Sequence, residues 1–143
     1  MAARATTQNV GFLLAKASQR WNELLAERFR REGFREVRPS YGSVLLPLFE
    51  EDGLRMGELA RRSRLSKQTM TTLVRLAERD GLVRRLADPD DARATLVRLT
   101  LRGRHFRAVA ERVLAELEEL VATRLSRRDL TRLNTMLKGV IEL

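Results

Sequence analysis

The chain of 143 residues contains no cysteine, which excludes disulfides, thiol redox sensing and cysteinyl metal sites. Its single histidine, His105, would need carboxylates alone to complete a zinc site, so we expect no metal and no cofactor. No apolar run approaches the roughly 18 residues of a membrane span, and the start, Met1 to Gln8, has no apolar signal core. We therefore expect a soluble, cytoplasmic protein that does not bind membranes.

Motifs that position phosphates or nucleophiles are also missing. The sequence has no P-loop, no Gly-x-Ser-x-Gly and no Gly-x-Gly-x-x-Gly. Its acidic residues are scattered, and His105 has no nucleophile beside it. We therefore predict that the protein is not an enzyme.

Lysine is scarce: it occurs only at Lys16, Lys67 and Lys138, although lysine and arginine together number 28. Against 19 acidic residues, this gives a formal net charge of +9. Such a charge favours a polyanionic partner, although a chain rich in arginine is also what a GC-rich genome encodes. A membrane-surface protein would be basic too, but it would need an amphipathic helix with lysine on its polar face.

Apolar residues recur every three or four positions over most of the chain, which is typical of helices. The pattern predicts helices over 7–32, from Pro39 to about 49, over 56–62, from 67 to about 80, over 100–125 and from 126 onwards. Proline at a first turn, caps at Ser66 and Thr100, and stops at Gly33 and Gly81 mark their ends. Pro47 is expected to kink or shorten the second helix.

The helices over 56–62 and 67–80 are joined by the short linker 63–65, which predicts a helix-turn-helix. The period then changes: 82–86 and 95–99 are typical of strands, with the turn formers 88–93 between them. A hairpin directly after a helix-turn-helix is a wing. The fold class we expect is mainly α with a small β-hairpin wing, in a single domain over 1–143 whose winged helix-turn-helix lobe spans 37–100.

The terminal helices, 7–32 and 100–143, are expected to make a dimer. The penultimate helix, about 25 residues long, would span roughly 37 Å, whereas a compact chain of this size has a radius of gyration of only about 14–15 Å. Its apolar stripe should therefore extend past its own core and be covered by a second copy. The alternative is a helix packed wholly against its own chain.

Projection of the helix 67–80 at 100° per residue separates a core face from an outward face. Met70, Leu73, Val74 and Ala77 share one side, whereas Gln68, Thr72, Arg75 and Arg79 share the other, with Thr71 at its edge. The outward face has donors and acceptors and no carboxylate, which suits base edges in a major groove. Ser66, Lys67 and the free amides of the helix start suit phosphate. Any polar surface helix carries similar residues, so this pattern is moderately specific.

Two residues near the tip of the predicted hairpin add to this interpretation. Arg93 is suited to a narrow minor groove, where negative potential is enhanced. DNA would repel Asp91, so we expect Asp91 to hold Arg85 or Arg93 in place. An ordinary turn with a solvated charge pair is the alternative.

The segments 57–71, 78–85, 88–94 and 99–100 together resemble the MarR family of bacterial transcriptional regulators. The resemblance rests on the helix-turn-helix, the run DGLVRR, an Asp-x-Arg wing and a closing Leu-Thr, and the helix order agrees across almost the whole chain. Upstream, 38–42 also looks like the start of that family's second helix. The chain departs from many members at Thr72, Arg75, Ala77 and Ala92.

The resemblance implies a homodimer whose two winged lobes straddle a pseudo-palindromic operator. It implies that Arg93 enters the minor groove with Asp91 as its partner. It also implies that the DNA-reading positions are Ser66, Lys67, Gln68, Thr69, Thr71 and Thr72. Many members release DNA when a small aromatic compound binds, and Trp21, Arg38, Tyr41 and His105 are candidates for such a pocket, although helical aromatics are more often core or capping residues.

The leading hypothesis is therefore a homodimeric, sequence-specific DNA-binding regulator, expected to be a repressor. An architectural protein that binds DNA without sequence preference is the alternative that the net charge favours. A winged-helix module for protein interaction is a third.

Overall fold

The computed structural model describes residues 6–143 and divides them into two compact units. The first runs to Ala110 and the second from Glu111 to Leu143. The boundary falls inside the long helix that spans Leu101–Leu125. The elements in chain order are α2 (Val10–Arg31), the 3₁₀ helix η1 (Pro39–Tyr41), α3 (Gly42–Glu50), β1 (Leu54–Arg55), α4 (Met56–Arg62), α5 (Lys67–Arg79), β2 (Val83–Asp88), β3 (Asp91–Leu99), α6 (Leu101–Leu125) and α7 (Arg127–Ile141).

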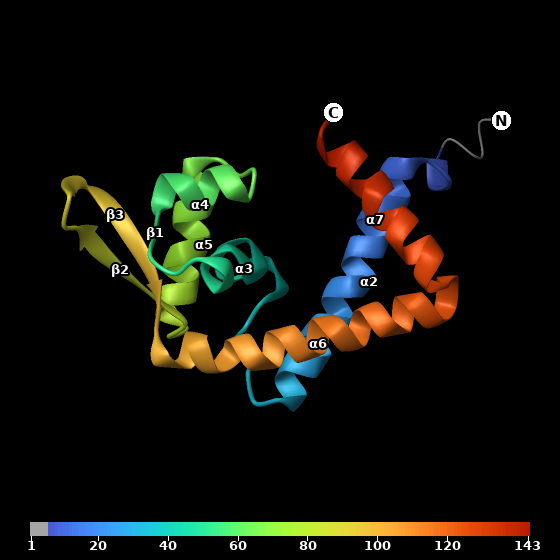
Figure 1. The fold of residues 1–143 in the computed structure, drawn as a ribbon, viewed down its shortest axis with the longest axis horizontal. Helices are drawn as coiled ribbons and strands as arrows, with labels where there is room; N and C mark the ends of the chain where they lie inside the picture. Colours follow the sequence, from blue (N-terminus) through green and yellow to red (C-terminus); the bar gives the residue numbers. More distant parts are fainter. Residues whose placement is uncertain (1–5) are drawn as a thin grey trace. The chain divides into compact units, whose positions relative to one another are not determined.

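The helix-turn-helix consists of α4 and α5, and α4 has the predicted bounds. Ser66 caps α5, its Oγ accepting a hydrogen bond from the backbone N–H of Thr69 at 3.1 Å. Gly81 ends the helix at φ +81°, a conformation that glycine adopts without strain. Figure 1 shows α4 and α5 together with α3 and the strands. The fold class expected from the sequence, mainly α with a winged helix-turn-helix, is confirmed.

The entry to this lobe differs slightly from the expectation. Pro39 opens the short η1, which leads directly into α3. Pro47 stays inside α3, and because proline has no N–H it cannot bond the carbonyl of Ser43, four residues earlier. The Ser63 hydroxyl donates to that carbonyl at 2.5 Å. The turn of the helix-turn-helix is thereby fastened to α3.

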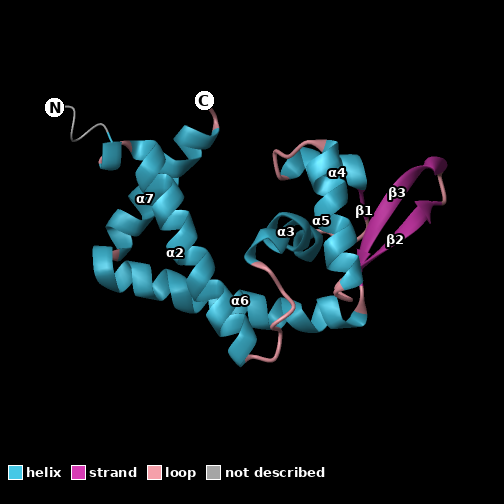
Figure 2. Cartoon of the chain, turned by 180° about the vertical axis from the view of Figure 1, so that it is seen from behind, coloured by secondary structure: helices cyan, strands magenta, loops and turns pink. Residues whose placement is uncertain are grey.

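The wing contains more strand than the sequence suggested. Only residues 89–90 separate β2 from β3, so the predicted loop over 88–93 is shorter, and Asp91 and Arg93 belong to β3. The short β1, which was not predicted, pairs with β3 to give the antiparallel order β1-β3-β2. Figure 2 shows the hairpin of β2 and β3 extending from the helices. Two residues of β1 carry too little pattern to be recognised without their partner strand.

Four phenylalanines form an aromatic cluster in the first unit. The Phe106 ring in α6 lies 4.8 Å from that of Phe29 in α2, 5.0 Å from Phe34 and 6.4 Å from Phe49 in α3. These edge-on and tilted contacts are favourable for aromatic pairs at such spacings. The cluster attaches the end of α2 and the first turns of α6 to the lobe that carries the helix-turn-helix.

The cap predicted at Thr100 is present, and Ser126, which was expected to begin the last helix, caps it. The hydroxyl of Thr100 accepts from the N–H of Gly103 at 3.0 Å, and that of Ser126 accepts from the N–H of Asp129 at 3.1 Å. In the second unit, α7 has no buried residue, although its sequence is amphipathic. Leu130, Leu133 and Leu137 of its apolar face are half-buried, whereas Met136, Val140 and Ile141 are exposed.

Candidate nucleic-acid interface

The outward face of α5 is as the projection predicted. Met70, Val74 and Ala77 are buried, and Leu73 is half-buried. The residues on the outward side are exposed: Gln68, Thr72, Arg75 and Arg79, together with Ser66, Lys67 and Thr69 at the helix start, whereas Thr71 is half-buried. The exposed face carries hydrogen-bonding groups and positive charge, which is the chemistry that base edges and phosphates require.

Several hydroxyls on this face are already used as donors. Thr71 Oγ1 donates to the Lys67 carbonyl at 2.8 Å, and Thr72 Oγ1 donates to that of Gln68 at 3.1 Å. Each hydroxyl has one hydrogen, so toward a ligand these oxygens can only accept. Thr71 and Thr72 are therefore suited to donors such as the amino groups of adenine or cytosine, or to methyl contact with thymine.

The positive side chains of the helix-turn-helix fall into two groups. Within residues 6–143, Lys67 and Arg75 form no ion pair, which leaves both charges available to a phosphate or a guanine. Arg79 instead pairs with Asp80, with its Nε 3.2 Å from Oδ1. The partner of Arg79 is thus its sequence neighbour Asp80, and Glu78, on its other side, binds Arg85. Arg75 is thus the better placed of the two arginines to bind DNA.

Tyr41 links the start of the lobe to the end of α5. Its side chain is completely buried, and its hydroxyl donates to Asp80 Oδ2 at 2.5 Å. Burial raises the pKa of Tyr41 to about 12, and the hydrogen bond and the charge of Asp80 add to this effect. The same hydrogen bond, with Arg79, lowers the pKa of Asp80. Tyr41 therefore helps to fix the position of the C-terminal end of α5.

Tyr41 makes the stability of the protein sensitive to alkaline pH. The folded state holds the phenolic proton more tightly than the unfolded state, so stability falls as the pH rises from about 10 through 12. The loss should total about 2–3 kcal/mol, at about 1.36 kcal/mol per pKa unit. Because the chain contains one tyrosine, the ultraviolet absorbance of the phenolate reports this group alone. A titration midpoint near the ordinary value of 10, or the same loss of stability in Tyr41→Phe, would contradict the prediction.

In the wing, the Arg93 side chain is exposed, whereas Arg85 is paired with a residue of α5. The Arg93 side chain is 95% exposed, with its Nε 3.7 Å from Asp91 Oδ1, which also accepts from the Arg93 backbone N–H at 3.0 Å. Arg85 binds Glu78 of α5 through both its backbone N–H, at 2.8 Å, and its guanidinium, at 2.9 Å. Of the two arginines considered for Asp91, the structure pairs it with Arg93, because Glu78 of the adjacent helix already holds Arg85.

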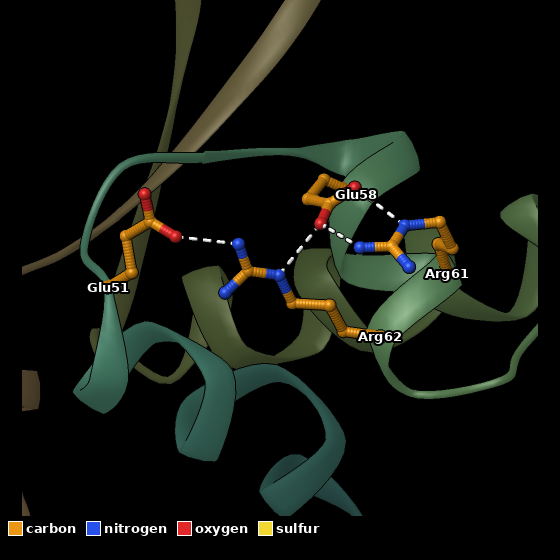
Figure 3. Close-up of polar contacts among 4 residues, drawn as sticks. All are labelled: Glu51, Glu58, Arg61 and Arg62. Carbon is orange, nitrogen blue, oxygen red and sulfur yellow. Dashed lines mark hydrogen bonds and ion pairs between the residues drawn. The ribbon is translucent and has the colours of Figure 1, made fainter.

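A network of four charged residues covers the outer side of α4 (Figure 3). Glu58 accepts from Arg61, with one of its contacts at 2.9 Å, and from Arg62 at 2.8 Å, and Arg62 also donates to Glu51 at 2.6 Å. The hydrogen bonds from Arg61, then those from Arg62, lower the pKa of Glu58 to about 2. Glu58 therefore stays ionised over the physiological range and holds both arginines on the surface of α4.

Sequence reasoning missed Arg64, which lies in the turn between α4 and α5. Arg64 has φ +53°, in the left-handed region that glycine and asparagine favour. Its side chain is exposed and forms no ion pair within the part of the chain that the structure describes. Only a positive φ distinguishes this residue, and the sequence gives no signal for it. Arg64 adds a third available charge beside Lys67 and Arg75.

The four residues suggested for a ligand pocket have different surroundings. Tyr41 is buried with its hydroxyl bonded to Asp80, whereas Arg38 and His105 are exposed and Trp21 is half-buried. None of the four lines the hollow that the structure shows beside α4 and the wing. Over residues 6–143, no three metal-ligating side chains gather, and no helix has the length and apolar character of a membrane span.

Comparisons with known proteins agree with this fold, but they match different lengths of the chain. A family model described as MarR family matches residues 39–94, which contain η1, α3, the helix-turn-helix and the wing through Ala94. The transcriptional activatory protein BadR of Rhodopseudomonas palustris is 43% identical over 54 residues, covering 38% of this chain and 31% of BadR. The chain thus spans about a third of the length of the curated relatives it matches.

Solved structures match nearly the whole chain. A probable transcriptional regulator from Pseudomonas aeruginosa is 26% identical with a TM-score of 0.80, over 92% of this chain and 96% of that one. The transcriptional repressor CouR, solved on a 23-mer DNA duplex, is 25% identical with a TM-score of 0.81, over 94% of each chain. The winged lobe, residues 39–94, therefore matches the MarR family, and the folds of these transcriptional regulators match nearly the whole chain.

Proposed function

We propose that this protein binds a pseudo-palindromic DNA operator as a homodimer and regulates transcription there. The observation that carries the proposal is the exposed face of α5, where Gln68, Thr72 and Arg75 stand without a carboxylate among them. The exposed Arg93 on the wing supplies a second, minor-groove element. The CouR structure on duplex DNA supports this assignment, because its fold is similar over 94% of each chain.

Uncovered apolar side chains support the homodimer. In α2, Val10 is 65% exposed and Leu13 is 49% exposed. In the second unit, Met136 and Ile141 are each 58% exposed on a helix with no buried residue. Single exposed apolar residues are common on protein surfaces, but an amphipathic helix with no buried residue and several exposed apolar side chains favours a partner. A second copy would cover these faces with an interface made from both ends of the chain.

Selection of bound fragments from a random DNA pool tests the function. The proposal predicts enrichment of an inverted repeat with half-site centres about one helical turn, roughly 10 bp, apart. Binding with a steep salt dependence but no enriched sequence would instead identify an architectural DNA-binding protein. No binding to duplex DNA at physiological salt would favour a protein-interaction module.

We further propose that the protein acts as a repressor, which a reporter gene placed behind the selected site tests directly. The names of its relatives include both an activatory protein and a repressor. Release of DNA by a small aromatic compound rests on the family resemblance alone, and repeating the selection with aromatic acids present tests it. An unchanged yield of bound fragments would remove the effector from the proposal.

Arg75 is the residue of α5 best placed to read a base. If it binds a guanine, Arg75→Ala should cost about 1–3 kcal/mol on the operator and relax preference at one position of each half-site. Competition binding against single-base operator variants measures this. Arg104→Ala, which removes an equal charge from an exposed residue of α6, is the matched control and should change base preference nowhere. An equal loss on all sequences would make Arg75 a phosphate contact.

A further inference from the structure

One charged side chain of the described residues is buried, and it lies in the wing. Asp88, at the end of β2, is 5% exposed. Its Oδ1 accepts from the backbone N–H of Asp90 at 2.9 Å, and its Oδ2 is 2.6 Å from Nε of Arg55. A buried carboxylate is costly unless it is paired and hydrogen-bonded, and here both oxygens have partners. Asp88 is therefore held on both sides, by the turn and by Arg55.

Arg55 reaches Asp88 from a different strand. It lies in β1, which pairs with β3 opposite Leu96, whereas Asp88 ends β2 on the other side of β3. The ion pair therefore spans the sheet from the edge strand β1, past β3, to the end of β2 beside the hairpin turn. Leu54, the neighbour of Arg55, is buried in the lobe and fixes the backbone at this end of the ion pair. The Arg55–Asp88 ion pair is called the tether below.

The ladder between β2 and β3 is irregular at this place. Ala87 pairs with Thr95, but the next residue, Asp88, pairs with Asp91. Residues 92–94 of β3 therefore have no partner on β2 and form a bulge, with Arg93 at its centre. Bulges re-aim a side chain locally. The direction of Arg93 depends on the two pairs that bound the bulge, and Asp88 belongs to one of them.

We propose that Arg55 is a positioning residue for the wing: by holding Asp88 it fixes the bulge that presents Arg93 to DNA. This inference rests on the proposed function, in which Arg93 enters the minor groove. Arg55 acts through Asp88 and Asp91 and does not itself touch DNA. Loss of the tether lets the tip of the hairpin move, and the minor-groove contact is then made less often.

A double-mutant cycle between Arg55 and Arg93 on the selected operator tests the proposal. Arg55→Met keeps an unbranched apolar stem and removes the charge. We expect it to weaken operator binding about 5- to 50-fold, comparable to the loss of one base-region contact. In the Arg93→Ala background the same substitution should change affinity less than about twofold, since the contact is already lost. Hydroxyl-radical footprints of Arg55→Met should lose the protection in the minor groove but keep the protection that α5 of each protomer gives.

Two further variants separate positioning from stability and from charge. The double variant Arg55→Met with Asp88→Asn removes the buried charge that Arg55→Met alone would leave unpaired. It should therefore stay folded even if Arg55→Met does not. Its footprint should show the same loss of minor-groove protection. Arg98→Met removes an exposed charge from β3 and should act additively with Arg93→Ala.

The outcomes distinguish the inference from the function on which it rests. Additive effects of Arg55→Met and Arg93→Ala, or a minor-groove footprint that survives in Arg55→Met, would overturn the tether and leave the regulator intact. If Arg93→Ala binds the operator as tightly as the parent, the assigned role of the wing is itself wrong.

Discussion

Replacing Gly103 by alanine should destabilise the protein by about 3 kcal/mol or more, at the upper end of what overpacking costs. A Cβ at this position would lie 2.2 Å from the carbonyl oxygen of Leu82 and 3.2 Å from Leu99 Cδ2. That carbonyl cannot retreat freely, because it accepts the backbone N–H of Thr100 at 3.0 Å. Thr100 is itself held by its hydroxyl, which donates to the Gly81 carbonyl at 2.6 Å.

Denaturant unfolding measures this loss, at fixed protein concentration because the stability of the proposed dimer would depend on concentration. Gly139→Ala in α7 is the matched control: no atom lies within 4 Å of its added Cβ. It should be neutral or stabilise by up to about 1 kcal/mol, because alanine favours the helix more than glycine. A Gly103→Ala protein as stable as the parent would show that α6 and Leu82, which follows α5, are not packed as closely as the structure indicates.

Two charges on the apolar face of α7 should strongly weaken the proposed homodimer. Met136 and Val140 lie one turn apart and are 58% and 39% exposed in the single chain. Burying two carboxylates per protomer against an apolar partner is costly, so Met136→Glu with Val140→Glu should raise the dimer dissociation constant at least about 100-fold. Sedimentation equilibrium measures this directly. Operator affinity should fall with it, because each lobe would then bind one half-site alone.

The control places the same charges on the opposite side of α7. Thr131→Glu with Thr135→Glu lowers the net charge equally, and both residues are exposed on the side of α7 that faces away from its apolar residues. This variant should remain dimeric. If both variants dimerise like the parent, α7 does not contribute to the interface, and the homodimer would have to rest on α2 and α6. If both are monomeric, added charge rather than its position is responsible.

Features that depend on neighbouring residues were predicted well from the sequence. The bounds of α4, the cap of α5 at Ser66 and the stop at Gly81 are local, because a cap and a positive φ involve residues within a few positions of each other. The outward face of α5 followed from helical periodicity alone. This is why the sequence was sufficient to identify the winged helix-turn-helix and the outward polar face of α5.

Contacts between distant segments were not predictable in the same way. The hydrogen bond from Tyr41 to Asp80 joins residues 39 positions apart, and Arg55 meets Asp88 across three strands. Arg85 had a plausible partner in Asp91 but binds Glu78, because packing of β2 beside α5 brings that pair together. Charged residues are numerous in this chain, and their spacing does not specify which of them meet.

The amino-acid sequence by itself determined the order of the elements, their caps and the polar character of the outward face of α5. These features depend on local geometry and on the alternation of apolar and polar residues. Only the tertiary structure decided which arginines are paired and which are available to DNA. Ion pairs form between side chains that folding brings within about 4 Å, and that proximity is a property of the packed chain.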